Sequence, residues 1–222
     1  MKLRKLGLLS FVICFAFSAQ TAPPVLAHCG NCGSGETEPH AAPKKASVGH
    51  TAPAFQLSDL DGNKHSLAKY KGKTIVLEWF NPECPFVVAV HEKGGVFETM
   101  AQKTINKDTV WLAINSSAKG RQGHGVAKNS AAAKKWNMKH PILVDENGTV
   151  GKAYGAKTTP HIFVIDAKGK LVFKGAPDNA PSGKRGAAYK AYLSDALADL
   201  AAGKRVRQAS NSSWGCSVKY GR

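Results

Sequence analysis

The feature of the sequence that most restricts the fold is an apolar run from Thr74 to Phe80 that ends at a proline-containing turn. The run is rich in β-branched and aromatic residues, which is typical of a central strand covered on both faces. Residues 81–83 supply the turn, and Pro85 then stands where the first turn of a helix tolerates proline. A buried strand that leads directly into a helix predicts an α/β domain.

The rest of the chain extends this pattern. A strand at 54–57, a turn at 61–63 and a returning strand at 64–67 predict an N-terminal β-hairpin. Apolar runs predict four further strands, at 110–115, 142–145, 162–166 and 171–174. Helical patterns predict helices at 85–104, at 131–136 and at 189–202, the first of them interrupted by Gly94 and Gly95. A long polar loop is expected over 116–128. Strands alternating with helices indicate a mixed central β-sheet flanked by helices.

Four segments follow one another along the 222 residues. Residues 1–27 combine a basic start, a short apolar stretch and a small residue at Ala27, which predicts a secretory signal peptide; an uncleaved anchor is the alternative. Small polar residues at 28–46 predict a flexible, cysteine-containing tether. The folded domain is expected at 47–202 and a basic C-terminal tail at 203–222. Trp214 and Cys216 in that tail indicate that its end docks on the domain.

The chain is strongly basic, with a formal net charge of +16 from 31 Lys and Arg against 15 Asp and Glu. Removal of 1–27 would leave +13. An exported protein, periplasmic or otherwise in the extracytoplasmic envelope, does not meet nucleic acid. We therefore expect the charge to favour association with an anionic envelope surface.

Cys84 lies at the junction between the apolar strand and the predicted helix. Unpaired backbone amides and the positive end of the helix dipole favour an anion there, so the junction lowers the pKa of a thiol and makes it nucleophilic. The alternative is a small buried cysteine that only packs.

Several segments, in order along 48–202, resemble the thioredoxin superfamily, and within it the exported peroxiredoxin-like or redoxin domains of the alkyl hydroperoxide reductase and thiol-specific antioxidant type. The segments that carry the resemblance are 48–55, 60–63, 67–73, 141–148, 154–155, 158–160 and 164–170. The resemblance implies a thioredoxin-like fold.

The resemblance also implies roles for individual residues. Cys84 matches the first cysteine of the family's redox pair, but Val87 occupies the place of the second, which excludes disulfide cycling within that turn. Leu77 and Asn81 replace the Pro and the Thr or Ser that orient peroxide in peroxiredoxins, so the resemblance implies slow rather than fast reduction of hydroperoxides. Glu78 matches the buried carboxylate that assists proton transfer in thioredoxins; a salt-bridged or edge-facing Glu is the alternative.

The other site residues lie further along the chain. Thr159 and Pro160 match the cis-proline loop that holds a substrate backbone, with an ordinary strand-initiating proline as the alternative. Cys216, in a Gly-Cys-Ser ending seen in some peroxiredoxin-like proteins, is the candidate resolving thiol, against an unpaired or structural cysteine.

Cys29 and Cys32 form a spaced pair in the tether. They are weak candidates for a zinc or copper site, because a metal needs three or four ligands; a local disulfide or an electron-relaying pair are the other interpretations. His91, His124 and His161 are expected at the surface or in packing. No metal site and no organic cofactor are predicted.

The sequence therefore predicts an exported thiol-based oxidoreductase, an antioxidant of cell redox homeostasis. Cys84 would exchange disulfides with proteins or reduce hydroperoxides, and Cys216 or an external thiol would resolve the product. One alternative is a thioredoxin-fold module that binds a peptide or a metal without redox turnover. Another is a basic envelope protein in which the redox fold is incidental.

Overall fold

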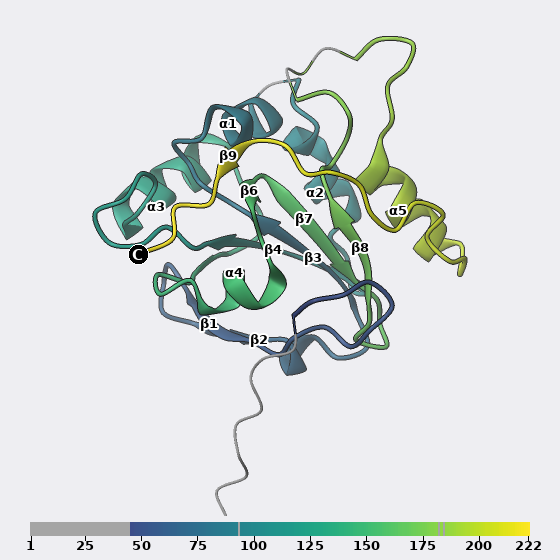
Figure 1. Ribbon diagram of the computed structural model, residues 1–222, viewed down its shortest axis with the longest axis horizontal. Helices are drawn as coiled ribbons and strands as arrows, with labels where there is room; N and C mark the ends of the chain where they lie inside the picture. Colours follow the sequence, from purple (N-terminus) through teal and green to yellow (C-terminus); the bar gives the residue numbers. More distant parts are fainter. Residues whose placement is uncertain (1–44, 93, 182, 184) are drawn as a thin grey trace, which may run out of the picture. The chain divides into compact units, whose positions relative to one another are not determined.

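The computed structural model describes residues 45–222 with the exception of 93, 182 and 184 (Figure 1). The predicted signal peptide, almost all of the tether, and Cys29 and Cys32 lie outside the described residues. The boundaries between the four segments stay predictions.

A seven-stranded mixed sheet forms the centre of the domain, in the order β2-β1-β5-β4-β3-β7-β8. Its strands are β1 (Gln56–Asp59), β2 (Lys64–Ser66), β3 (Thr74–Trp79), β4 (Thr109–Asn115), β5 (Ile142–Val144), β7 (His161–Ile165) and β8 (Leu171–Gly175). β3, β4 and β5 are parallel, and the remaining pairs are antiparallel. The expected mixed sheet and N-terminal hairpin are confirmed.

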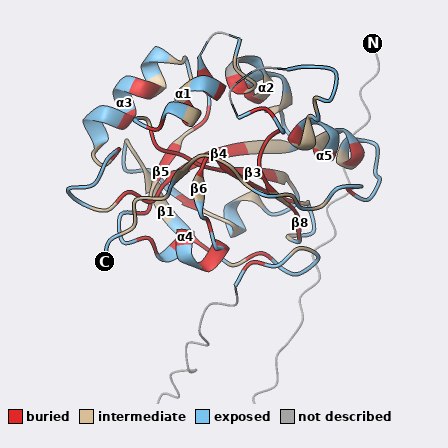
Figure 2. Ribbon diagram, turned by 45° about the horizontal axis from the view of Figure 1, so that its top comes forward, coloured by how far each residue is buried: buried red, intermediate tan, exposed pale blue. Residues whose placement is uncertain are grey.

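Helices cover both faces of this sheet (Figures 1 and 2). They are η1 (Ala68–Tyr70), α1 (Pro85–His91), α2 (Phe97–Thr104), α3 (Val126–Lys135), α4 (Thr149–Tyr154) and α5 (Tyr192–Ala201). Residues of α1, α2, α3 and α5 pack on one face, and α4 packs on the other. Within the described part of the chain, no helix has the length and apolarity to cross a bilayer.

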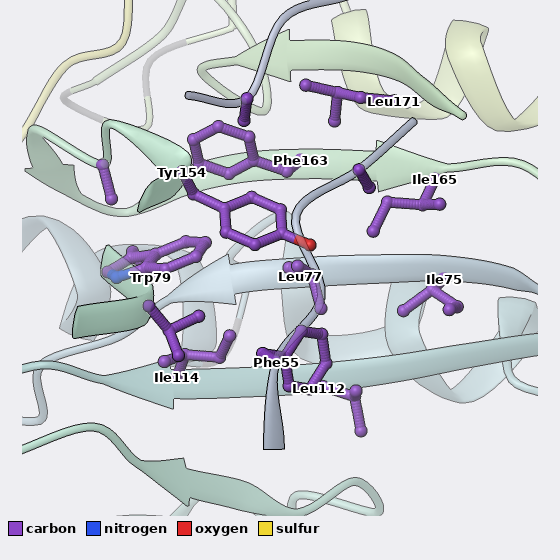
Figure 3. Packing of buried hydrophobic residues seen from close by; sticks show 14 of the residues in the cluster. Phe55, Ile75, Leu77, Trp79, Leu112, Ile114, Tyr154, Phe163, Ile165 and Leu171 are labelled. Atoms are coloured by element: carbon purple, nitrogen blue, oxygen red, sulfur yellow. The ribbon is translucent and has the colours of Figure 1, made fainter. Parts of the chain in front are cut away.

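The side chains of β3 explain the apolar run. Ile75, Leu77 and Trp79 face α4, where Trp79, Tyr154 and Phe163 pack ring against ring (Figure 3). Val76 joins the cluster on the opposite face. From Ile75 to Trp79 every residue of this strand is buried, so the strand needs no polar face.

The helices differ from expectation at four places, one of which is the single turn η1, which was not predicted. α3 begins at Val126 rather than at 131, so the polar loop is shorter, and α5 begins at Tyr192 rather than at 189. The short helix α4 was not expected. Its six residues are too few for a periodic stripe, and the Asp145 carboxylate holds its first turn by accepting the amides of Val150 and Gly151.

The break between α1 and α2 at the glycines is confirmed, and it has a steric cause. Gly95 lies against the backbone of α1, where a Cβ would overlap the carbonyl oxygen of Val90. Glycine permits this close approach, which turns the chain from one helix to the next.

A second, two-stranded sheet joins β6 (Thr158–Thr159) to β9 (Cys216–Ser217). In Figure 1 the C-terminal tail crosses the domain, and β9 lies beside β6 near α1. The expectation that the end of the tail docks on the domain is confirmed.

Candidate active site

Cys84 occupies the N-cap position of α1, in extended backbone with φ −84° and ψ 121°. Its amide donates to the Asn81 carbonyl at 3.1 Å, and its own carbonyl accepts the Val88 amide at 3.0 Å. Pro85 is the first helical residue, as expected, because its missing N–H costs nothing in the first turn. The turn therefore fixes Cys84 between β3 and α1, and the residue is 0% exposed.

The sulfur of Cys84 lies in a cluster of hydrogen-bonding groups. As a thiol it donates to the Thr159 carbonyl, with 3.0 Å between sulfur and oxygen. Burial on its own would raise the pKa of Cys84. Hydrogen bonds to the sulfur from the Cys216 thiol and from the amides of Val87 and Cys216 outweigh burial and lower that pKa below its ordinary value.

Cys216 responds in the opposite direction. Burial, then the hydrogen bond and the charge of Cys84, raise the pKa of the Cys216 thiol to about 11. Both cysteines are free thiols in this structure. Cys84 therefore ionises first, and Cys216 remains protonated as its hydrogen-bond donor.

Thr159 connects the two cysteines. The Thr159-Pro160 peptide bond is cis, as the family resemblance implied. The strand β6 pairs antiparallel with β9 so that Thr159 lies opposite Cys216, while the Thr159 carbonyl accepts from Cys84. The structure thus brings Cys84, Thr159, Pro160 and Cys216 together.

Three residues hold the tail in place: Trp214, which the sequence indicated as an anchor, and Gly215 and Tyr220, which it did not. The indole N–H of Trp214 donates to the Asp178 carbonyl at 2.7 Å, and its ring lies 6.0 Å from that of Phe86, centroid to centroid. Gly215 packs so closely on β6 that a Cβ would overlap the Thr159 carbonyl oxygen. The Tyr220 hydroxyl donates to the Ala156 carbonyl at 2.9 Å.

Glu78 is also 0% exposed, but its partners are other than Cys84. One carboxylate oxygen lies 2.7 Å from Nε2 of His91, and the other accepts the Trp111 indole N–H at 3.1 Å. No hydrogen bond joins Glu78 to Cys84 in the described part of the chain. Of the two interpretations from the sequence, the contacts match a salt-bridged Glu; its part in proton transfer stays a prediction.

The loop before Cys84 is fixed by a second loop. The Asn81 side chain accepts the Glu83 amide and donates to the Gln122 carbonyl, while the Glu83 carboxylate pairs with Lys128 at 2.9 Å. Gln122 in turn donates to the Glu83 carbonyl at 2.9 Å. Asn81 therefore positions the cysteine turn by binding loop backbone, a role that its sequence neighbours do not indicate.

The remaining histidines are dispersed. His91 and His161 are buried, and His124 pairs with Glu146 at 3.2 Å. Among residues 45–222, leaving aside the three undescribed ones, no group of three or more His, Cys, Asp or Glu side chains is arranged to hold a metal ion.

Comparisons with known proteins agree with this geometry. The Redoxin family model matches residues 47–192. A thiol-disulfide oxidoreductase ResA from Geobacillus thermodenitrificans is 33% identical over 134 residues, which is 56% of this chain and 66% of that protein. A chloroplastic peroxiredoxin Q from Triticum aestivum is 29% identical over 140 residues, or 58% of each chain.

Two solved structures cover more of the chain. An uncharacterised conserved protein from Geobacillus kaustophilus has a TM-score of 0.71 and 28% identity, and covers 79% of this chain and 93% of its own. A hypothetical protein from Sinorhizobium meliloti has a TM-score of 0.69 and 27% identity over 80% of this chain and 97% of its own. The predicted thioredoxin-like fold is confirmed. With its single cysteine at the start of α1, the chain belongs to the Redoxin family, a thiol-based branch of the thioredoxin superfamily.

Proposed function

We propose that this protein is an exported thiol oxidoreductase that cycles between two free thiols and a Cys84–Cys216 disulfide. The observation that carries the proposal is that both cysteines meet at Thr159: the Cys84 thiol donates to the Thr159 carbonyl, and β9 places Cys216 opposite Thr159, packed against the cluster that holds Cys84. The pKa values of the two thiols shift in opposite directions. One thiol is prepared to attack and the other is held beside it to resolve. Val87, in the usual place of the resolving cysteine, contributes its backbone amide to the sulfur of Cys84, and its side chain packs in the core.

In the first step the Cys84 thiolate attacks its oxidant. With a hydroperoxide, an S–O bond forms, the O–O bond breaks, and the departing alkoxide takes up a proton, which leaves Cys84 as a sulfenic acid. With a disulfide, an S–S bond forms to Cys84 and a thiolate departs. The names of the curated relatives, a thiol-disulfide oxidoreductase and a peroxiredoxin, support both substrate classes.

In the second step Cys216 attacks the oxidised Cys84. A Cys84–Cys216 bond forms, and water or the substrate thiol leaves with the proton of Cys216. Part of the elevation of the Cys216 pKa comes from the Cys84 anion. Because oxidation removes that anion, Cys216 ionises more readily when its thiolate is needed. An external thiol reductant then returns both cysteines to the reduced state.

Other residues have supporting roles. The Thr159 carbonyl accepts the Cys84 thiol, and the backbone of Thr159 pairs with β9 opposite Cys216. For Glu78 to transfer a proton to or from the site, its contact with His91 would first have to break. The export of the protein and its association with an anionic envelope surface rest on the sequence of 1–27 and on the basic composition.

Disulfide mapping by mass spectrometry before and after one equivalent of hydrogen peroxide tests the proposal. A Cys84–Cys216 peptide should appear on oxidation and disappear with dithiothreitol, and Cys84→Ser should abolish both thiol reactivity and turnover. Full activity of Cys84→Ser would contradict the proposal. So would a Cys84 that stays reduced and alkylates slowly, which is what the peptide- or metal-binding alternative predicts.

A further inference from the structure

The attacking thiol is covered by the protein's own tail. Cys84 is 0% exposed, whereas Cys216, which donates to its sulfur, is partly exposed. The tail segment that contains Cys216 therefore lies between the sulfur of Cys84 and the solvent from which a substrate would come.

That segment is held by its backbone. β9 pairs antiparallel with β6, with Cys216 opposite Thr159 and Ser217 opposite Thr158. Strand addition to an exposed edge is a general way to bind an extended peptide. A protein disulfide would have to reach Cys84 in the same form, as an extended segment that places a cysteine next to the reactive sulfur. The tail thus occupies the position that a peptide substrate needs.

We propose that residues 214–217 act as a built-in substrate strand, which selects small hydroperoxides as oxidants of Cys84 and excludes peptide disulfides while it is docked. The inference rests on the proposed function and narrows its substrate class. The chemistry is the peroxide route given above, with Cys84 oxidised to a sulfenic acid and the hydroperoxide reduced to an alcohol or water.

The two substrate classes need different movements of the tail. A small hydroperoxide needs only a rotation of the Cys216 side chain, which leaves the β6–β9 backbone pairing intact. A peptide needs the edge of β6 itself, so β9 must leave.

Departure of β9 would disrupt anchors on both sides of Cys216. On one side Trp214 bonds the Asp178 carbonyl, and on the other the Val218 amide donates to the Lys157 carbonyl at 3.0 Å. Ala118 and Lys219 add a backbone bond of 2.9 Å, and Tyr220 bonds the Ala156 carbonyl. The docked state is thereby favoured, and the fraction of molecules open to a peptide is small.

Gly215→Ala distinguishes small oxidants from peptide disulfides, because the added Cβ overlaps the Thr159 carbonyl and so opposes docking of the tail without altering Cys84. Gly221→Ala is the matched control in the same tail, since its Cβ would make only an ordinary contact of 3.4 Å with Ala118. Both are placed in the full-length chain with Cys216→Ser, so that the tail keeps a hydroxyl donor without resolving the adduct. Oxidation at Cys84 is then quantified by site-resolved mass spectrometry.

Three probes are compared: hydrogen peroxide with dimedone trapping of the sulfenic acid, hydroxyethyl disulfide, and a mixed disulfide of a short cysteine-containing peptide. Gly215→Ala should raise the rate with the peptide by about tenfold or more, because that rate is proportional to the open fraction. The rates with the two small oxidants should change by less than about twofold, and Gly221→Ala should change none of the three.

A peptide rate that Gly215→Ala leaves unchanged overturns the inference, as does a small disulfide that accelerates as much as the peptide. If Gly215→Ala fails to fold, Trp214→Phe, which removes the bond to Asp178 and part of the packing of the indole, should still raise the peptide rate selectively, and no rise would count against the inference. The proposed function fails separately, if peroxide gives no Cys84–Cys216 disulfide in the wild-type chain.

Discussion

At the scale of single residues, the two thiols of the site differ because each is the other's main polar neighbour. Cys84 is surrounded by donors to its sulfur, whereas Cys216 faces the charge that develops on Cys84. The low pKa of the nucleophile therefore depends on a residue that is far away in the sequence.

Replacing Cys216 should make this dependence visible. Cys216→Ala removes the thiol donor, so the pKa of Cys84 should rise, whereas Cys216→Ser keeps a hydroxyl donor and should leave it closer to the wild-type value. The pH dependence of Cys84 alkylation by iodoacetamide, followed by mass spectrometry, gives both midpoints. Equal midpoints in the two variants would show that Cys216 does not stabilise the thiolate.

The buried contacts of Glu78 predict that its replacement lowers the free energy of unfolding. Glu78→Leu leaves the buried His91 and the Trp111 indole without their partner, which should cost roughly 3–5 kcal/mol of unfolding free energy. Urea unfolding measures the loss. Combining Glu78→Leu with His91→Phe should restore part of it, because the orphaned imidazole is then removed as well.

A proton-transfer role for Glu78 needs a separate readout. Glu78→Gln keeps the shape of the side chain but removes its charge. If Glu78 moves protons, the pH profile of turnover should shift; an unchanged profile with reduced stability would assign it to structure alone.

The chemically distinctive residues of the site could be predicted from the sequence, and the close contacts could not. Cys84, Cys216, Thr159 and Pro160 were expected, and they meet in the structure. Gly215 was not expected, because nothing in its local sequence shows that it will lie against the backbone of Thr159.

At the scale of elements, the short strand β9 is the part of the fold that the redox state should affect most. A Cys84–Cys216 bond would attach it covalently to the start of α1. Peptide-resolved hydrogen exchange should therefore show slower exchange over 214–218 after oxidation with peroxide, and no such change in Cys84→Ser. Faster exchange on oxidation would mean that the disulfide strains the docked tail.

The elements themselves were predictable where a pattern runs over many residues. Apolar runs placed β3 and β4, and glycines placed the break between α1 and α2. β6 and β9 have two residues each, and they exist because distant backbone segments meet. No local periodicity encodes such a pair.

At the scale of the whole molecule, two buried histidines predict sensitivity to acid. Burial lowers the pKa of His140 to about 4, and burial together with nearby lysines lowers that of His161 to about 4. In the unfolded chain both titrate near their ordinary value of about 6.5. The unfolded state therefore binds more protons between these values, and stability should fall as pH decreases.

The loss should reach roughly 3 kcal/mol per histidine as pH falls from about 6.5 to 4. Urea unfolding across this range measures it. His140→Phe should flatten the dependence, because in the described part of the chain neither ring nitrogen of His140 has a hydrogen-bond partner to lose. If His140→Phe leaves the pH dependence of the unfolding free energy unchanged, groups other than His140 cause the acid sensitivity.

The way the tail is held also has a consequence for the divergence of related sequences. Cys216 is aligned by main-chain pairing with Thr159, and apart from Val206 the side chains from Lys204 to Ser213 are exposed or only partly buried. Arg207, which pairs with Asp199, and Asn211, which accepts the Ala176 amide, also have specific partners, but selection acts on few other positions there. We expect homologous tails to drift freely in sequence and in loop length before Trp214, while the dipeptide Gly215-Cys216 persists as the most slowly changing part of the C-terminus.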